Sequence, residues 1–301
     1  MPTTSGTEGT LPEPEEVGRA VVAWGAGHRR DLPWRRTRDP WAVLVSEVML
    51  QQTQVARVLD PYRRFLEAFP TPGACAAAGV GAVVRAWAGL GYNRRAVRLH
   101  GAACAIVERH GGQVPAGLDE LRALPGVGAY TARAVRSFAF ELDTGVVDTN
   151  VARLLARCVA GRPLRPTAAQ QLADRLVAPG QSWVTNQALF DLGAGYCTSR
   201  APRCPTCPLV HLCAWAGGGR PEPDPARTSA GTARPQPAFV GSDRQGRGRL
   251  VAALRHGPVP PAELATASGW PGDRPRTERV AAGLVADGLA AWDTDGSLVL
   301  R

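Results

Sequence analysis

Four of the seven cysteines lie close together, with a spacing that suits a metal centre. Cys197, Cys204, Cys207 and Cys213 follow the order C-x6-C-x2-C-x5-C within seventeen residues. Four thiolates at these intervals can bind a cubic iron–sulfur cluster, whereas structural zinc usually takes two C-x2-C pairs separated by a longer insert. Flanking prolines favour a loop shaped around a ligand. Zinc, a disulfide pair and unrelated thiols remain alternatives at this point.

A single carboxyl group stands within a strongly apolar segment. Residues 41–50 read WAVLVSEVML, in which Ser46 and Glu47 are the polar members. A carboxyl group in such a helix lies at its rim or is partly desolvated. Desolvation raises the pKa of a carboxyl group and makes it a usable general acid. Glutamines 51, 52 and 54 follow, and such side chains can wedge into a disturbed duplex and form hydrogen bonds there.

A short glycine-rich turn and an aspartate follow further along the chain. Leu124 to Gly128 reads LPGVG between the helical patterns at 119–123 and 129–138, which predicts two helices joined by a tight hairpin. The glycines let the backbone approach a phosphate, and the N–H groups at the start of the second helix then point at the anion. Asp148 comes twenty residues after Gly128, before a new helical run. It can cap that helix, and it can also supply a carboxylate for chemistry.

The elements that must position these residues are predicted to be helices. Short helical patterns punctuated by Gly and Pro run from Pro14 to about Ala216, with almost no strand pattern, which predicts an all-α body. We expect residues 1–13 to be a disordered tail and the Pro/Gly-rich residues 217–239 to be a linker. The last segment, 240–301, predicts a winged-helix-like domain. Its predicted elements are helices at 243–255, 260–268 and 274–288, and a hairpin between Trp292 and 298–300.

The charge balance indicates a polyanionic partner. The chain has 301 residues, a net charge of +9 and a pI near 9.8, and all 35 basic residues are arginine. Strong positive charge suits nucleic acid, although a lysine-poor composition can also reflect genome bias. Without lysine, no side-chain amine can form a Schiff base with an opened sugar. No apolar run is long enough to cross a bilayer and the N-terminus is polar, so we expect a cytoplasmic protein.

Together these motifs resemble a known family. The hairpin and aspartate resemble the helix-hairpin-helix DNA glycosylase superfamily, and the cysteine loop is similar to that of its endonuclease III and MutY branches. Within that superfamily the chain resembles the MutY-type adenine DNA glycosylases over residues 17–216. The segments that carry this resemblance are Arg30 to Arg35, Ser46 to Gln54, Gly89 to Tyr92 and Asn186 to Leu189. The resemblance implies a two-lobed fold, with a cluster lobe (14–36 and 144–216) and a six-helix-barrel lobe containing the hairpin (37–143).

The resemblance also implies catalytic roles. Glu47 matches the glutamate that protonates the adenine ring and then helps activate water. Asp148 matches the aspartate that stabilises or traps the positively charged sugar, and Asn150 matches an asparagine near that sugar. Tyr130 matches a position where members carry Tyr or Ser and where endonuclease III carries its lyase lysine. One acid and one carboxylate suffice for this chemistry.

Binding roles follow from the same resemblance. Residues that line the adenine pocket correspond to Trp34, Arg35 and Gln187. Residues inserted into the base stack beside the lesion correspond to Gln52 and Tyr92. The DNA backbone would be contacted by Gly126, Val127, Gly128, Arg200 and Arg203. The four cysteines match the ligands of a [4Fe-4S] cluster, which orders the loop that presents the two arginines to phosphate.

The implied activity is that of a monofunctional glycosylase in base excision repair. It would remove adenine opposite 8-oxoguanine or guanine in double-stranded DNA, as a monomer in the cytoplasm at the nucleoid. One alternative is a thymine or uracil mismatch glycosylase on the same scaffold. Another is an iron–sulfur transcription factor with a winged helix, which leaves Glu47, Tyr130 and Asp148 unexplained.

The sequence departs from the family pattern in three places. Asn93 stands where a second tyrosine is frequent, and Thr149 stands where many members have Gly. Typical long members end in a Nudix-like domain that reads 8-oxoguanine, but residues 240–301 are too short for one. Phe239 to Gln245 is similar to the tail of shorter actinobacterial-type members. We expect this domain to contact phosphates through Arg244, Arg247 and Arg249 and to offer no pocket for a purine.

Overall fold

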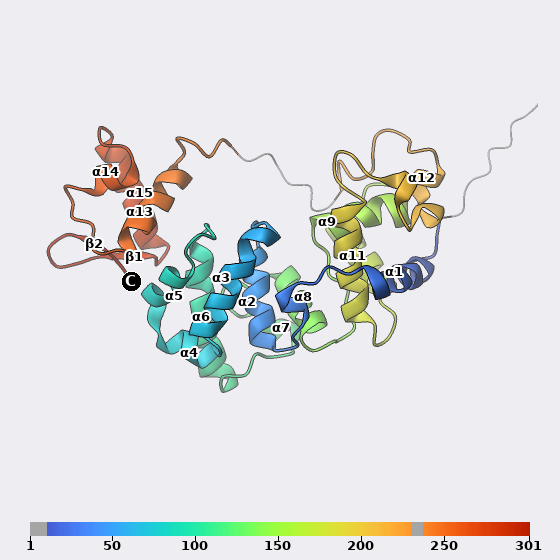
Figure 1. The fold of residues 1–301 in the computed structure, drawn as a ribbon, viewed down its shortest axis with the longest axis horizontal. Coiled ribbons are helices and arrows are strands. Elements are labelled where there is room, and N and C mark those ends of the chain that lie inside the picture. The colour runs from blue at the N-terminus through green and yellow to red at the C-terminus, as the bar shows by residue number, and fades with distance from the viewer. Residues whose placement is uncertain (1–10, 230–236) are drawn as a thin grey trace, which may run out of the picture. The chain divides into compact units, whose positions relative to one another are not determined.

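The protein divides into two compact units in a computed structural model that describes residues 11–229 and 237–301. Unit 1 comprises Met1–Arg36 and Ala132–Arg234, and unit 2 comprises Thr37–Thr131 and Pro235–Arg301. Helices make up most of both units (Figure 1), which confirms the all-α prediction. Within the described residues, no helix combines the length and apolar character needed to span a bilayer.

Unit 1 is built around the packing of its first helix on two later ones. Its elements are α1 (Pro14–His28), the 3₁₀ turn η1 (Pro33–Arg35), most of α8 (Ala129–Phe138), α9 (Thr149–Leu154), the π-helical turn η2 (Leu155–Ala160), α10 (Pro166–Leu176), α11 (Ser182–Gly195), η3 (Cys204–Thr206), η4 (Val210–Leu212) and α12 (Ala214–Gly217). Helix α1 contacts α10 and α11. The core between them includes Val17, Val21, Leu155 and Leu189, all fully buried.

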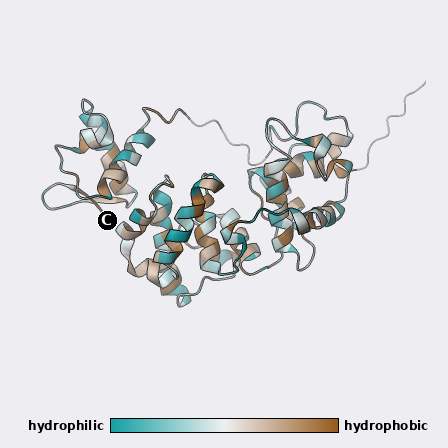
Figure 2. Ribbon diagram, in the orientation of Figure 1, coloured by the Kyte–Doolittle hydropathy of each residue, from teal (hydrophilic) through white to brown (hydrophobic). Residues whose placement is uncertain are grey.

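Unit 2 contains a bundle of helices around a fully buried helix. Its first elements are α2 (Pro40–Leu50), α3 (Val55–Ala68), α4 (Pro72–Ala77), α5 (Gly79–Ala86), α6 (Arg94–His110) and α7 (Leu118–Arg122). Helix α2 is buried continuously from Trp41 to Met49, which explains why its sequence is apolar all round. The other helices carry both polar and apolar residues (Figure 2), as expected when one side faces the core.

The C-terminal part of unit 2 has three helices and a hairpin, close to the predicted elements. These are α13 (Asp243–Leu254), α14 (Leu264–Ser268), α15 (Arg274–Ala286), β1 (Ala290–Trp292) and β2 (Leu298–Leu300). The strands pair antiparallel, with Ala291 opposite Val299. Helix α13 starts where Ser242 accepts a hydrogen bond from the N–H of Gln245, a favourable N-cap. The second helix begins later than predicted.

Part of the predicted linker is packed against unit 1. Asp224 forms a buried ion pair with Arg157, with Nη2 of the arginine 2.5 Å from Oδ2. The Ser229 hydroxyl accepts a hydrogen bond from the N–H of Leu164 at 3.1 Å. Polar contacts therefore hold a segment that has few apolar residues. Residues 132–143, which we expected in the barrel lobe, group with unit 1.

Two glycines on α13 provide a test of packing in the C-terminal domain. A Cβ atom at Gly246 would lie 2.0 Å from Cη2 of Trp270, whereas one at Gly248 would meet no atom within 4 Å. We expect Gly246→Ala to lower the free energy of unfolding by about 1–3 kcal/mol because the indole must shift. We expect Gly248→Ala to raise it by roughly 0.5–1 kcal/mol, since alanine favours a helix interior. Denaturant unfolding of both variants measures this, and equal effects would contradict the packing.

Candidate active site and DNA-binding surface

The predicted functional residues fall into two sets, one on each unit. Unit 2 carries the predicted acid and the residues expected to touch the DNA stack and backbone: Glu47, Gln52, Tyr92, Gly126, Val127, Gly128 and Tyr130. Unit 1 carries the predicted sugar-stabilising and pocket residues and the cysteine loop: Trp34, Arg35, Asp148, Asn150, Gln187, Cys197, Arg200, Arg203, Cys204, Cys207 and Cys213.

Glu47 is buried on α2. Its helix is capped by Asp39, which accepts a hydrogen bond from the N–H of Trp41 at 3.1 Å. Glu47 is only 4% exposed, and the neighbouring Ser46 hydroxyl donates to its own helix, to the carbonyl of Val43. The sequence left two positions open for this carboxyl group, the rim of the helix or a desolvated site. The burial of Glu47 places it at a desolvated site.

A buried arginine joins the end of α2 to the loop before α6. Arg95 donates from Nη1 to the carbonyl oxygens of Val48 and Met49, both at 2.7 Å. Its Nη2 donates to Thr53 Oγ1 at 2.9 Å and to the carbonyl of Gly91 at 3.2 Å. Burial lowers the pKa of Arg95 to about 10. The guanidinium therefore serves as a multiple hydrogen-bond donor that holds two loops in one arrangement.

Those two loops carry the residues expected in the base stack. Gln52 follows α2 with φ at 55°, and Tyr92 precedes α6 with φ at 46°. The left-handed region is costly for side chains other than Gly, and such strain is often stored where it serves function. Gln52 is exposed and Tyr92 is 44% exposed. Both side chains are thus displayed at the surface of unit 2 by backbone that Arg95 holds in place.

The predicted hairpin is present and lies in a cleft. Gly126 adopts φ of 80°, which a glycine tolerates without strain, and the N–H of Val127 donates to the carbonyl of Leu124 at 3.1 Å. Val127 is buried and anchors the turn, while Gly126 and Gly128 are exposed. The cleft, of about 750 Å³, is also lined by Arg98, Arg122 and Tyr130. Backbone donors and two cations at one cleft suit a phosphate group.

On unit 1, Asp148 is held rigidly at the start of α9. Its Oδ1 accepts hydrogen bonds from the N–H groups of Asn150 at 2.8 Å and Val151 at 2.7 Å. Its Oδ2 accepts from the side chain of Asn150 at 2.9 Å. The capping role is therefore real, and it fixes the carboxylate beside the amide of Asn150. A capped carboxylate also gains from the partial positive charge of the helix start.

Arg153 connects this pair to the cysteine loop. Its Nη2 donates to Asn150 Oδ1 and to the carbonyl of Gly193, both at 2.8 Å. Its Nε donates to the carbonyl of Cys197 at 2.5 Å. One side chain thus orients Asn150 and fixes the first cysteine of the loop.

The segment expected to line the adenine pocket is locked onto α11 by an ion pair. Arg35 donates to both oxygens of Asp191, at 2.7 and 3.0 Å, and both side chains are almost fully buried. Burial would raise the pKa of Asp191, but hydrogen bonds from Arg35 and Arg30 outweigh it and lower that pKa. Trp34 and Gln187 are also buried, and the carbonyl of Gln187 accepts from Arg35 at 3.5 Å. The structure therefore brings Trp34, Arg35 and Gln187 into one neighbourhood.

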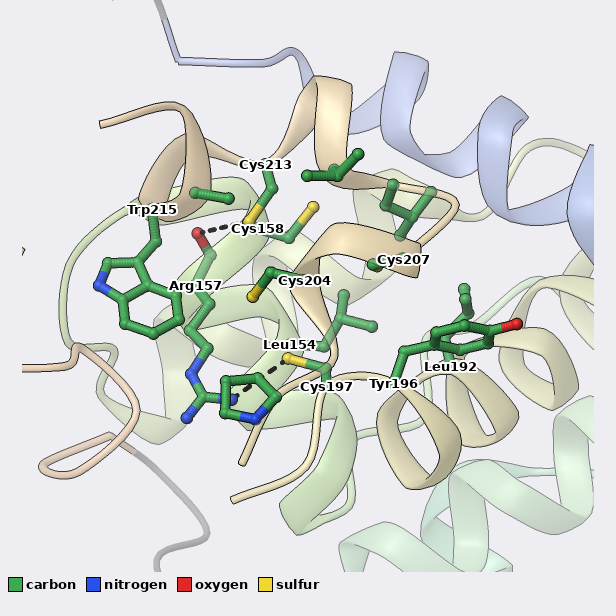
Figure 3. Close-up of a pocket in the computed structure, with 14 residues that line it drawn as sticks. Leu154, Arg157, Cys158, Leu192, Tyr196, Cys197, Cys204, Cys207, Cys213 and Trp215 are labelled. Atoms are coloured by element: carbon green, nitrogen blue, oxygen red, sulfur yellow. Dashed lines mark hydrogen bonds between the residues drawn. The ribbon is translucent and has the colours of Figure 1, made fainter. Parts of the chain in front are cut away.

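The four predicted ligand cysteines line a single cavity (Figure 3). Arg157 lies at its side, with Nη1 3.5 Å from Sγ of Cys197, and a fifth cysteine, Cys158, also contributes to the lining. The lining is otherwise largely apolar. Thiol donors in an apolar cavity beside a cation fit an anionic iron–sulfur cluster.

The four cysteines line one cavity, and in the described residues they do not converge on a single point. No group of three or more His, Cys, Asp or Glu side chains in the described part of the chain is arranged to hold one ion. Zinc needs four ligands converging at about 2.0–2.3 Å. In a cubic cluster each thiolate binds its own iron, so the sulfurs surround a volume instead. Arg200 and Arg203 are exposed on the same loop.

Sequence reasoning missed the positioning residues. Arg95, Arg153, Arg157 and Asp191 have partners far along the chain or on the backbone, and nothing in the sequence distinguishes them from other charged residues. Asn186 belongs to a segment that carries the family resemblance, but the sequence did not predict its own contacts. Its side chain accepts a hydrogen bond from the N–H of Val146 at 2.8 Å and donates one to the carbonyl of Thr144 at 2.8 Å, and so it binds the segment that precedes Asp148.

Comparison with known proteins finds similar sequences among DNA repair enzymes. Residues 45–179 match the profile of the HhH-GPD superfamily base excision DNA repair proteins. The adenine DNA glycosylase of Mycolicibacterium smegmatis is 42% identical, over 93% of this chain and 94% of that protein. The adenine DNA glycosylase of Mycobacterium tuberculosis is 43% identical, over 96% of this chain and 97% of its own length. The human adenine DNA glycosylase is 44% identical over 64% of this chain and 38% of that longer protein.

Solved structures share the fold. A thermostable thymine-DNA glycosylase superimposes with a TM-score of 0.63 and 28% identity, covering 68% of this chain and 97% of that one. A trapped covalent endonuclease III–DNA intermediate gives a TM-score of 0.58 and 26% identity, covering 68% of this chain and 98% of that one.

The role of Arg95 can be tested by denaturation. We expect Arg95→Met to lower the free energy of unfolding by about 2–4 kcal/mol, because the buried carbonyls of Val48 and Met49 lose their donor. The matched control is Arg94→Met. That neighbouring side chain is 58% exposed in a 3.3 Å ion pair with Asp287, so its loss should cost less than about 1 kcal/mol. Similar losses in both variants would contradict the assignment.

Proposed function

The chain belongs to the adenine DNA glycosylases of the HhH-GPD superfamily, and we propose that it removes adenine mispaired with 8-oxoguanine or guanine in duplex DNA. It hydrolyses the N-glycosidic bond as the first step of base excision repair. Relatives that align with almost the whole chain support adenine as the base, over thymine or uracil. The same relatives leave no support for an iron–sulfur regulator.

The burial of Glu47 is the observation that carries the mechanism. Adenine leaves a stable N-glycosidic bond poorly, so its ring must be protonated before it departs as a neutral base. A carboxyl group that is 4% exposed, on a helix wall of apolar residues, is well suited to donate that proton and then to help activate water. This supports Glu47 as the general acid.

Asp148 supplies the opposing charge. The sugar becomes positively charged as the base leaves, and a carboxylate fixed in advance stabilises that charge without reorganising. Its three hydrogen bonds to Asn150 and Val151 provide the fixed position. Asn150 is oriented by Arg153 and supplies an amide near the same sugar.

Recognition needs an extrahelical base and a held duplex. Adenine has to leave the stack to reach the acid, and Gln52 and Tyr92 would fill or separate the stack beside it. Trp34, Arg35 and Gln187 would line the adenine pocket. Phosphates would be bound by the hairpin at Gly126, Val127 and Gly128. The exposed Arg200 and Arg203 would bind further phosphates. A net charge of +9 favours such binding.

The lack of lysine restricts the chemistry. No side-chain amine is present to form a Schiff base with the abasic sugar, and Tyr130 stands at the position of the lyase lysine of endonuclease III. The enzyme is therefore proposed to be monofunctional and to leave an intact abasic strand. We propose that it acts as a monomer on chromosomal DNA in the cytoplasm.

Cys197, Cys204, Cys207 and Cys213 would hold a [4Fe-4S] cluster. A bound cluster would order this loop. Within this chain, Arg157 would balance part of its negative charge, and the ordered loop would present Arg200 and Arg203 to the DNA backbone.

The catalytic proposal is tested by Glu47→Gln. The amide keeps size and polarity but has no transferable proton, so we expect single-turnover release of adenine to fall by about 10²–10⁴ while affinity for mispaired duplex is kept. The matched control is Glu67→Gln, an exposed glutamate on α3 of the same unit, which should excise normally. If Glu47→Gln retains activity within about tenfold, or ~1.4 kcal/mol of transition-state stabilisation, Glu47 is not the acid.

The cluster proposal is tested by metal analysis. We expect the purified protein to be brown with about four irons per chain. Cys204→Ser should lose iron and bind duplex more weakly, while Cys104→Ser, on α6 of unit 2, should keep both. Stoichiometric zinc in a colourless protein would overturn the assignment.

A further inference from the structure

The residues that follow the cysteine loop pack against unit 1 instead of forming the linker that their composition predicts. We call residues 221–229 the return segment. At its start, the carbonyl of Pro221 accepts a hydrogen bond from the indole Nε1 of Trp215 at 3.0 Å. At its end, the hydroxyl of Ser229 accepts one from the N–H of Leu164 at 3.1 Å. The return segment is therefore bound to unit 1 at both ends.

Between these two ends, Asp224 binds the guanidinium of Arg157 with both of its carboxylate oxygens. Nε of Arg157 donates to Oδ1 at 3.0 Å, and Nη2 donates to Oδ2 at 2.5 Å. The two side chains are only 2% and 9% exposed. A buried ion pair is weak evidence for stability, because the cost of removing two charges from water offsets their attraction. Two parallel hydrogen bonds do, however, fix the plane and the direction of a guanidinium.

The five N–H donors of the Arg157 guanidinium have five acceptors. Besides the two bonds to the carboxylate, Nη1 donates to the carbonyl of Thr198 at 2.7 Å and to Sγ of Cys197 at 3.5 Å. Nη2 also donates to the carbonyl of Ser199 at 3.3 Å. The ring of Trp215 lies beside the guanidinium, with its centroid 4.9 Å from Cζ (Figure 3). The orientation set by the carboxylate thus decides where the other donors point.

Those other donors reach the cysteine loop at two places that the proposed function uses. Cys197 is the first proposed ligand, and a cation bound to its sulfur stabilises an anionic cluster. Thr198 and Ser199 are the two residues before Arg200, which is proposed to contact phosphate. Donors on these two carbonyls fix the backbone that presents Arg200. One guanidinium therefore serves both the ligand and the DNA-contacting residue.

Without the carboxylate, the guanidinium would keep its buried positive charge with only two carbonyls and a sulfur as partners. A buried charge without a counter-ion is costly, so the side chain would turn toward solvent or draw water in beside it. Either change weakens the bond from Nη1 to the sulfur of Cys197. The carboxylate at Nε and Nη2 therefore keeps Nη1 of Arg157 on that sulfur.

We propose that Asp224 is a positioning residue for the cluster loop, and that it acts by holding Arg157 on the sulfur of Cys197 and on the backbone that presents Arg200. This inference rests on the proposed cluster. It extends the cluster site beyond the four-cysteine motif, to a carboxylate that the motif does not contain. The return segment thereby becomes part of the cluster site.

The test variant is Asp224→Asn in the full-length protein loaded with its cluster. The amide keeps the size of the side chain but removes its charge and one acceptor oxygen. We expect the visible absorbance of the cluster to be lost about tenfold faster in the presence of an iron chelator, as when a hydrogen bond around a metal ligand is lost. The visible circular dichroism of the cluster should also change, because it reports the surroundings of the ligand sulfurs. Asp224→Glu keeps the charge on a longer side chain and should give a smaller rise.

Two further variants of the return segment serve as matched controls. Glu222→Gln removes a carboxylate whose pair with Arg227 is 3.5 Å long and more than half exposed on both sides. Ser229→Ala removes the anchor at the end of the segment and leaves the ion pair of Asp224 in place. Both should lose the cluster at the wild-type rate. If Ser229→Ala accelerates the loss as much as Asp224→Asn does, Asp224 only tethers the segment and the inference is wrong.

A double-mutant cycle tests whether Asp224 acts through Arg157. Arg157→Gln should lose its cluster faster than the wild type, and adding Asp224→Asn should cause no further change, because the shared partner is already gone. Effects that multiply would contradict the inference. In Asp224→Asn the slope of log affinity for duplex against log salt should fall by about 1, as the phosphate contact of Arg200 is lost. The slope should stay unchanged in Glu222→Gln.

Iron analysis of the wild type separates this inference from the proposed cluster. A wild-type protein that holds zinc, or no metal, would refute the proposed cluster. A wild type with about four irons per chain, whose cluster is lost no faster in Asp224→Asn than in Glu222→Gln, would refute the inference alone.

Discussion

The guanidinium of Arg95 lies inside unit 2 and donates hydrogen bonds to backbone carbonyls from two separate segments. A helix leaves its last carbonyl groups without partners, and those of α2 end close to Glu47. Arg95 satisfies Val48 and Met49 at that point, and it holds the loop of Tyr92 with the same group. The end of the helix that carries the proposed acid and the loops of the two residues proposed to enter the base stack are therefore joined by one side chain.

Buried or half-buried arginines repeat this arrangement in unit 1. Arg35 ties the segment of Trp34 to Asp191, and Arg153 joins Asn150 to the backbone of Cys197. Arg157 binds Asp224 and approaches the sulfur of Cys197. A planar fork of donors can bridge several acceptors at once, and it is less strongly hydrated than an ammonium, so burying it costs less. A chain without lysine can thus keep charged groups in its interior wherever a loop has to be fixed.

Motifs that act through their own backbone could be predicted from the sequence. Asp148 caps the helix that it precedes, Gly126 makes the hairpin turn, and the helices of the C-terminal domain follow their local patterns. The bracing arginines could not be predicted. Arg35 and Asp191 are 156 residues apart, and any of 35 arginines could have been the partner. The packed segment around Asp224 was missed for a related reason, because composition measures apolar content and this segment is held by hydrogen bonds and an ion pair.

The contact between Asn93 and Arg255 shows how a departure from a family pattern can be informative. Asn93 stands where a second tyrosine is frequent, and in isolation this looked like a minor change in the pocket. In the structure the side-chain oxygen Oδ1 of Asn93 accepts a hydrogen bond from Arg255, a residue of the C-terminal domain 162 positions later. This hydrogen bond joins the residue that follows α13 to the residue that follows Tyr92.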